Sequence, residues 1–217
     1  MNAPTLEAET AAVPTHQVTR GGMLVPDVTA FLAGLCIMTI ELLAGNVAAT
    51  YVGMSLHTWT STIGAILAGM AIGNYVGGRL ADRYPAGRTL AILFFASSAA
   101  CALIYPVNAA IGQALDGFDV GPSRIAVHIT VVFFLPGMLL GTMSPVIARM
   151  ALDQGRASGR TVGSVFACNA LGSIAGTFVA GFFLMRYWHT SWIVWSVVAA
   201  LALLGLAYAI GARRTSR

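Results

Sequence analysis

Long apolar runs separated by short polar segments dominate this chain. Five stretches carry no charged residue, and each exceeds the roughly 20 residues with which a helix crosses the bilayer core. They cover residues 42–78, 89–115, 125–148, 161–185 and 187–212. A sixth candidate run, 28–52, is interrupted only by Glu41. Because the first stretch is too long for one crossing, we expect the polar segment GMSLHTW (53–59) to divide it.

The runs predict an all-α integral membrane protein with six transmembrane helices. We expect these helices at about 28–52, 59–80, 89–112, 125–149, 161–185 and 190–211. Strands of a membrane barrel would instead alternate in polarity over about ten residues, whereas these runs are continuous. Three regions follow: a polar, disordered cytoplasmic tail at 1–25, the transmembrane domain at 26–212, and a basic C-terminal end at 213–217. The tail lacks the apolar core of a signal peptide.

Composition and charge agree with a membrane location. The chain is 57% hydrophobic and 9% charged, with a mean hydropathy of +0.78, whereas soluble domains are about 25% charged. All twelve basic residues are arginine. Six crossings place Arg124 and Arg186 on one side and the other ten on the opposite side: Arg20, Arg79, Arg83, Arg88, Arg149, Arg156, Arg160, Arg213, Arg214 and Arg217.

This asymmetry predicts the orientation of the chain. Short loops rich in Lys and Arg stay in the cytoplasm, so we expect both termini there, with the bilayer of a bacterial inner membrane as the surroundings. The net charge of +4 then reflects membrane orientation, and nothing points to a nucleic-acid partner. Cys36, Cys101 and Cys168 lie inside the predicted helices without a short spacing, which argues against disulfides and a zinc site. No motif predicts a cofactor or another metal.

Glycine spacing predicts how the helices pack. The second helix carries Gly69, Gly73 and Gly77 at four-residue intervals, and the fifth carries Gly172 and Gly176. Small residues one turn apart let a neighbouring backbone come close in a membrane. The segments AGMAIGNYVG (68–77) and ACNALGSIAG (167–176) share the pattern A-x-x-A-[IL]-G-x-x-x-G. We therefore expect two three-helix units, and an odd number of crossings in each unit makes the repeat inverted.

The loop after the second helix contains the segment GGRLADRYPAGR. It resembles the loop between helices two and three of the major facilitator superfamily, whose pattern runs G-x-L-x-D-R-x-G-R. The candidate motif residues are Gly78, Asp82, Arg83 and Arg88, together with Leu80. Pro85 and Ala86 depart from the pattern by separating Arg83 from the final Gly-Arg pair. The simpler interpretation is a cytoplasmic anchor with one local ion pair, worth about 1 kcal/mol or less.

A longer resemblance covers most of residues 31–185. The segments ELLAGNVAATYVGMSLHTWTS, GNYVGGRLADR, LPGMLLGTMSPVIARMAL and GRTVGSVFACNALGSIAGTFVAGFFL are similar to the membrane domain of bacterial membrane-bound spermidine synthase-like proteins. In those fusions a soluble Rossmann-like domain performs the aminopropyl transfer. We find no strand-turn-helix glycine fingerprint in this sequence, because every Gly-rich stretch lies in an apolar run of membrane length. We therefore expect the membrane part alone, without catalytic residues of its own.

Glu41 is the ionisable residue deepest in a predicted span, and such groups indicate function by default. Counting about 1.5 Å of rise per residue places Glu41 and His128 at similar depth. We hypothesise that the two share a hydrogen bond or proton in a polar pocket that also holds Asn46. The alternative is that Glu41 is a structural polar link and that His128 sits at the membrane interface.

Two classes of function fit these features. The first is a non-catalytic membrane module that anchors a partner, for which the resemblance implies a soluble aminopropyltransferase-like enzyme on the cytoplasmic face. The second is a small-molecule transporter, in which two six-helix chains pair as a homodimer to make a twelve-helix body. Glu41 is the sole carboxylate in the predicted spans, which argues against polyamine cations as cargo.

Overall fold

The computed structural model describes residues 24–117, 121–154 and 158–215. All regular elements of these residues are helical: α1 (Leu24–Val52), α2 (Leu56–Arg83), α3 (Ala86–Ala102), α4 (Ile104–Ala114), α5 (Pro122–Gly141), α6 (Met143–Leu152), α7 (Ser158–Phe178), the π-helix η1 (Val179–Leu184), α8 (Met185–Tyr187) and α9 (Thr190–Thr215). The predicted tail lies outside the described residues up to position 23, as do positions 216 and 217 of the basic end.

Each of the six predicted runs is helical, but three of them are not single α-helices. The third run bends by 42° between α3 and α4. The fourth divides at Thr142 into α5 and α6. A proline removes the hydrogen bond to the carbonyl four residues earlier, and Pro145 stands three residues after this break. The fifth run passes from α7 through η1 into α8.

Four helical stretches of the described chain are long and apolar enough to cross a membrane. They are Leu24–Val52, Pro122–Leu152, Gly159–Tyr187 and Thr190–Ala212. The bent pair α3–α4 is a fifth if it forms one span. The prediction of six crossings also requires α2, which is long enough but carries Ser, Thr, His and Asn among its apolar residues and Arg and Asp at its end. The chain is thus an integral membrane protein with four or five candidate spans among its described residues, and the six crossings stay a prediction.

The break between the first two helices lies within the predicted segment 53–59. The helix α1 ends before Gly53, whose φ of +74° is a left-handed conformation that glycine adopts without strain. Ser55 then caps α2, because its Oγ accepts a hydrogen bond from the backbone N–H of Thr58 at 3.2 Å. The helix α2 therefore begins at Leu56, three residues before the predicted start.

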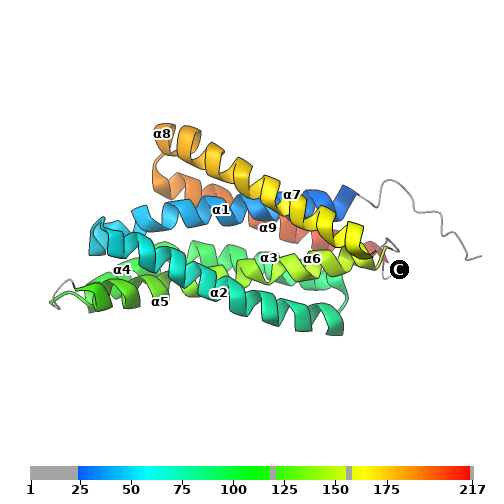
Figure 1. Cartoon of the computed structure of the whole chain (residues 1–217), viewed down its shortest axis with the longest axis horizontal. Helices are drawn as coiled ribbons and strands as arrows, with labels where there is room; N and C mark the ends of the chain where they lie inside the picture. The colour runs from blue at the N-terminus through cyan, green and yellow to red at the C-terminus, as the bar shows by residue number, and fades with distance from the viewer. Residues whose placement is uncertain (1–23, 118–120, 155–157, 216–217) are drawn as a thin grey trace, which may run out of the picture.

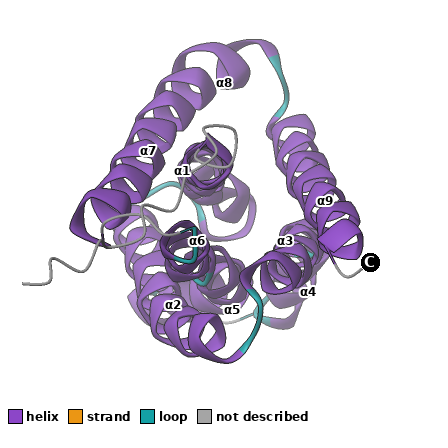
Figure 2. Cartoon of the chain, turned by 90° about the vertical axis from the view of Figure 1, so that its right-hand side faces the viewer, coloured by secondary structure: helices purple, strands orange, loops and turns teal. Residues whose placement is uncertain are grey.

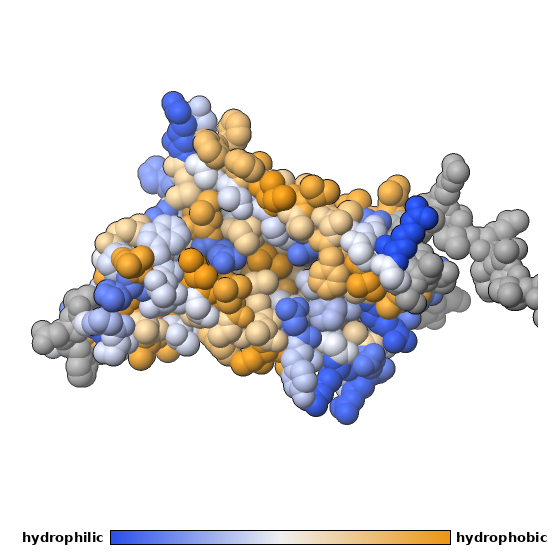
Figure 3. Space-filling view, in the orientation of Figure 1, coloured by the Kyte–Doolittle hydropathy of each residue, from blue (hydrophilic) through white to orange (hydrophobic). Residues whose placement is uncertain are grey.

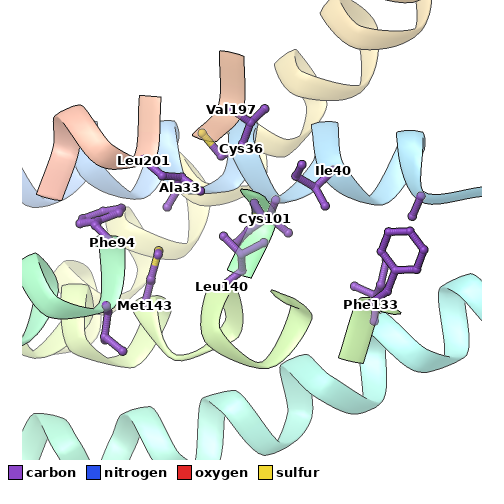
Figure 4. Packing of buried hydrophobic residues seen from close by; sticks show 14 of the residues in the cluster. Ala33, Cys36, Ile40, Phe94, Cys101, Phe133, Leu140, Met143, Val197 and Leu201 are labelled. Atoms are coloured by element: carbon purple, nitrogen blue, oxygen red, sulfur yellow. The ribbon is translucent and has the colours of Figure 1, made fainter. Parts of the chain in front are cut away.

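The helices form an elongated bundle in which two rods are central (Figures 1 and 2). In the end-on view, α1 and α6 lie inside, while α7, α9, α2 and the α3–α4 rod surround them. Burial agrees, since 61% of the most apolar window of α1 and 56% of that of α5–α6 are buried, against 22% for α7 and 28% for α9. Figure 4 shows the core between these rods, where Cys36 of α1, Phe94 and Cys101 of α3, Leu140 of α5 and Leu201 of α9 converge.

Glycine seams join the helices in two pairs. In the first pair, Gly69, Gly73 and Gly77 of α2 lie against the backbone of α5 and Thr142, so that a Cβ added at Gly69 would stand 2.6 Å from the Phe134 carbonyl oxygen. In the second pair, Gly172 and Gly176 of α7 lie against the α1 carbonyls of Phe31 and Leu35. At each of these five positions a neighbouring backbone lies where a side chain would stand.

The two seams repeat each other's contacts. Gly73 faces Met138 and Gly172 faces Phe31; the two glycines are 99 residues apart and their partners 107. The same spacings relate Gly77 facing Thr142 to Gly176 facing Leu35. Within each pair, the residue numbers of the two contacting helices increase in the same direction, so the two helices of each pair are parallel. The short turn between α1 and α2 makes the two pairs antiparallel to each other. This arrangement is what an inverted three-helix repeat requires.

Candidate functional site

Glu41 lies beside an apolar cavity between α1, α2 and α5. The cavity measures about 10 Å³ and is lined by Glu41 with Ile37, Ile40, Ile66, Met70, Phe133, Pro136, Gly137 and Leu140. The Glu41 side chain is half-buried, and no hydrogen bond or ion pair joins it to another described residue. A cavity of this size holds about one water molecule and no organic ligand.

His128 occupies a different polar cluster, near the end of the bundle where α1 ends and α5 begins. It is fully buried, and its Nε2 makes a 2.7 Å hydrogen bond with Asn108 Oδ1 of α4. The Asn108 amide in turn donates to the Val47 carbonyl of α1 at 3.0 Å. The ring of Tyr51 stacks on the imidazole, with centroids 5.9 Å apart. The cluster therefore ties α1, α4 and α5 together.

The expectation that Glu41 pairs with His128 is wrong. Glu41 lies 11 residues before the end of α1, about 16 Å along the axis, whereas His128 lies six residues after the start of α5, about 9 Å. The helix α5 begins at Pro122, three residues before the predicted start, and is 20 residues long rather than 25. Within the bundle His128 faces Asn108 of α4, while Glu41 faces the small apolar cavity. Asn46 is half-buried, and no hydrogen bond links it to Glu41 or His128 among the described residues.

Several polar side chains of the membrane helices are partly exposed on the face between α7 and α2. In Figure 3 hydrophilic groups lie between α7, above, and α2, below, amid hydrophobic surroundings. Glu41 and Asn46 of α1 keep part of their surface open, and Asn74 of α2 is exposed. Lipid offers such groups no hydrogen bonds, so a face of this kind favours a protein partner or a polar ligand.

The loop motif forms an ion-pair network at the opposite end of the bundle. Asp82 Oδ1 lies 3.6 Å from Arg149 Nη1 at the end of α6, and Arg149 Nε donates to Asp153 Oδ1 at 2.9 Å. All three side chains are about half exposed or more, so the network is worth at most about 1 kcal/mol. The predicted local ion pair thus has its partner on another helix rather than in the motif.

The rest of the motif is more helical than expected. The helix α2 continues through Asp82 and Arg83, and only Tyr84 and Pro85 separate it from α3. Gly78 has open space where a Cβ would stand, so the motif does not need glycine there for close packing. Arg83 and Arg88 are both exposed.

Side-chain hydrogen bonds close this end of the bundle across other helices. Ser164 Oγ of α7 donates to Asp27 Oδ1 of α1 at 2.9 Å. Thr29 Oγ1 of α1 lies 2.6 Å from the hydroxyl oxygen of Tyr208 on α9. The starts of α1 and α7 and the last turns of α9 therefore meet the ends of α2 and α6 at one end. This end carries most of the arginines whose side chains the structure describes (Figure 3, right).

Sequence reasoning missed Asn108, the residue that connects His128 to α1. A signal was present, because Asn108 is an amide in a run without charged residues, and such a group needs an internal partner in a membrane. The partner itself could not be inferred, since it depends on the 42° bend that brings α4 against α1 and α5.

Comparison with known proteins adds three findings. Residues 28–217 match the family model described as Major Facilitator Superfamily. The chain is 28% identical over 172 residues to Polyamine aminopropyltransferase 1 of Ralstonia nicotianae, covering 79% of this chain and 31% of that protein. It is 29% identical over 145 residues to Polyamine aminopropyltransferase 2 of the same organism, covering 67% and 27%. This chain thus spans less than a third of either relative. No solved structure matches.

Proposed function

Because this chain belongs to the Major Facilitator Superfamily, we propose that it is a non-catalytic membrane module that positions an aminopropyltransferase-like enzyme at the cytoplasmic membrane surface. The observation that carries the proposal is the similarity to two relatives named as polyamine aminopropyltransferases. The part of this chain that the structure describes is helical, and four of its helical stretches are apolar and long enough to span a membrane. In this proposal the transfer chemistry belongs to the partner.

The proposal includes six crossings of a bacterial inner membrane with both termini in the cytoplasm. Support comes from the end of the bundle where α2 and α6 terminate, which carries Arg79, Arg83, Arg88 and Arg149, whereas the opposite end carries Arg124 and Arg186. The repeated glycine seams support a 3+3 half of a facilitator bundle, because they pair helices of the first unit with helices of the second.

The arginine-bearing end offers a surface for such a partner. Asp82 is engaged by Arg149, whereas Arg83 is exposed and has no ion pair with a described residue. Exposed charges of one sign steer an oppositely charged partner and make its association dependent on salt. We therefore expect an acidic patch on the enzyme that docks here.

The test is purification of the tagged protein from its native membrane in mild detergent, followed by mass spectrometry and an assay of aminopropyl transfer to polyamines. We expect an enzyme in stoichiometric amount, with activity in the recovered material. Arg83→Gln should lower the recovery at moderate salt, and Arg186→Gln, a matched charge change at the opposite end, should not. Recovery of the protein alone, or of companions without transferase activity, would contradict the proposal.

A second candidate is a transporter assembled from two copies, and the partly open polar face between α2 and α7 favours it. Pairing across this face would enclose Glu41 and Asn46 in a shared cavity. In a cysteine-free background, Leu67→Cys on α2 should then form a disulfide between copies in the membrane. Leu203→Cys on α9, which is at least as exposed, is the control. Cross-linking at neither position, or only at Leu203, would exclude this pairing.

A further inference from the structure

A second and larger cavity opens at the turn between α2 and α3. Its volume is about 350 Å³, which falls within the usual range for ligand pockets. The lining residues come from the last turn of α2, the turn itself and the first two turns of α3: Leu80, Tyr84, Pro85, Arg88, Thr89, Ile92 and Leu93. This cavity is separate from the one beside Glu41, which is lined by other residues.

The chemistry of the lining is that of an amphiphile site. Leu80, Ile92 and Leu93 supply apolar walls, and Arg88 is the sole charged residue among the lining residues. Thr89 is satisfied within its own helix, since its Oγ1 donates to the Pro85 carbonyl at 3.0 Å. A ligand that fills this cavity must therefore place an apolar group against these walls and one negatively charged group at Arg88.

Charge around the cavity favours an anion. Arg88 is exposed, and no hydrogen bond or ion pair joins it to another described residue. Arg79 and Arg83 lie at the same end of α2, and Arg79 stacks over Tyr75 at 4.2 Å rather than pairing with a carboxylate. The adjacent carboxylate, Asp82, is held by Arg149. The guanidinium of Arg88 is thus available, and its planar fork suits a phosphate.

We propose that this cavity binds one anionic phospholipid of the surrounding membrane. The phosphate lies at the Arg88 guanidinium, and the upper part of an acyl chain lies against Ile92 and Leu93. The location suits this ligand, because α2 is one of the six proposed crossings, and the end of such a helix stands at headgroup level, where anionic lipids attract basic residues. The inference goes beyond the proposed module and does not depend on whether it has a partner.

The experiment is native mass spectrometry of the full chain in detergent, titrated with phosphatidylglycerol or with phosphatidylcholine of the same acyl chains. We expect one phosphatidylglycerol to bind about five-fold more tightly than phosphatidylcholine, a ratio that corresponds to one basic residue near an anionic headgroup. Arg88→Gln should remove this preference. Arg160→Gln, an equal charge change at the exposed start of α7 and outside the cavity, should keep it.

A second variant tests the apolar part without changing charge. Ile92→Trp should fill part of the cavity and reduce binding of both lipids at least five-fold, while Ile63→Trp, on the exposed face of α2, should leave both unchanged. Equal losses for Arg88→Gln and Arg160→Gln would show a general effect of surface charge and overturn the proposal. Unchanged lipid binding by Ile92→Trp would overturn the proposal as well, because the acyl chain of the lipid would then lie outside this cavity.

Discussion

Replacing Gly69 by alanine tests the seam between α2 and α5 directly. A Cβ at position 69 would stand 2.6 Å from the Phe134 carbonyl oxygen and 2.9 Å from the Met138 nitrogen. Both are backbone atoms, which cannot rotate away as a side chain can. Ordinary contact begins at 3.4 Å, so the two helices must separate locally by roughly 0.5–0.8 Å, a gap that forfeits a quarter to a half of each contact's dispersion energy.

The net effect follows from two opposing contributions. Overpacking costs about 1–3 kcal/mol, and the upper part of this range, about 2–3 kcal/mol, applies where backbone atoms must move. The better helix propensity of alanine returns about 0.8–1 kcal/mol. We expect a net loss of about 1–2 kcal/mol in the free energy of unfolding. At roughly 2–4 °C per kcal/mol for a chain of this size, the melting temperature should fall by about 2–8 °C.

The assay is thermal unfolding in detergent, followed by circular dichroism, with Gly64→Ala as the matched control. Gly64 lies in the same helix and has no heavy atom within 4 Å of the position of its Cβ. Gly64→Ala should therefore leave the melting temperature unchanged or raise it by a few degrees. If Gly69→Ala melts at or above the wild-type temperature, the close approach of α2 and α5 at this position is refuted.

Three further predictions concern the polar contacts and the cysteines. Asn108→Ala should lower the melting temperature by several degrees, because it leaves His128 without its partner at a cost of about 1–3 kcal/mol, while Asn46→Ala should have little effect in the same assay. Asp82→Asn should lower the free energy of unfolding by less than about 1 kcal/mol. A loss above about 2 kcal/mol in thermal unfolding would contradict the small contribution expected of an exposed ion pair. In single-cysteine variants, maleimide should label the half-buried Cys168 faster than the buried Cys36, and equal rates would contradict the burial.

Much of the architecture follows from properties that are local in the sequence. The length and polarity of the runs determined that the chain is a helical membrane protein, because a backbone in lipid must satisfy its own hydrogen bonds. The division of arginines between loops determined the predicted orientation. The spacing of Gly69, Gly73 and Gly77 determined a packing face, since residues one turn apart align on a helix.

Only the tertiary structure decided which groups meet. The bend before α4 and the π-helix after α7 left no sign in the continuous apolar runs, whereas the break at Thr142 has a local signal in Pro145. The bend brings Asn108 rather than Glu41 to His128, and the meeting of helix ends gives Asp82 its partner on α6. A side chain's depth follows from its position in a helix, but its partner depends on the rotation and the true length of two helices, which no single segment encodes.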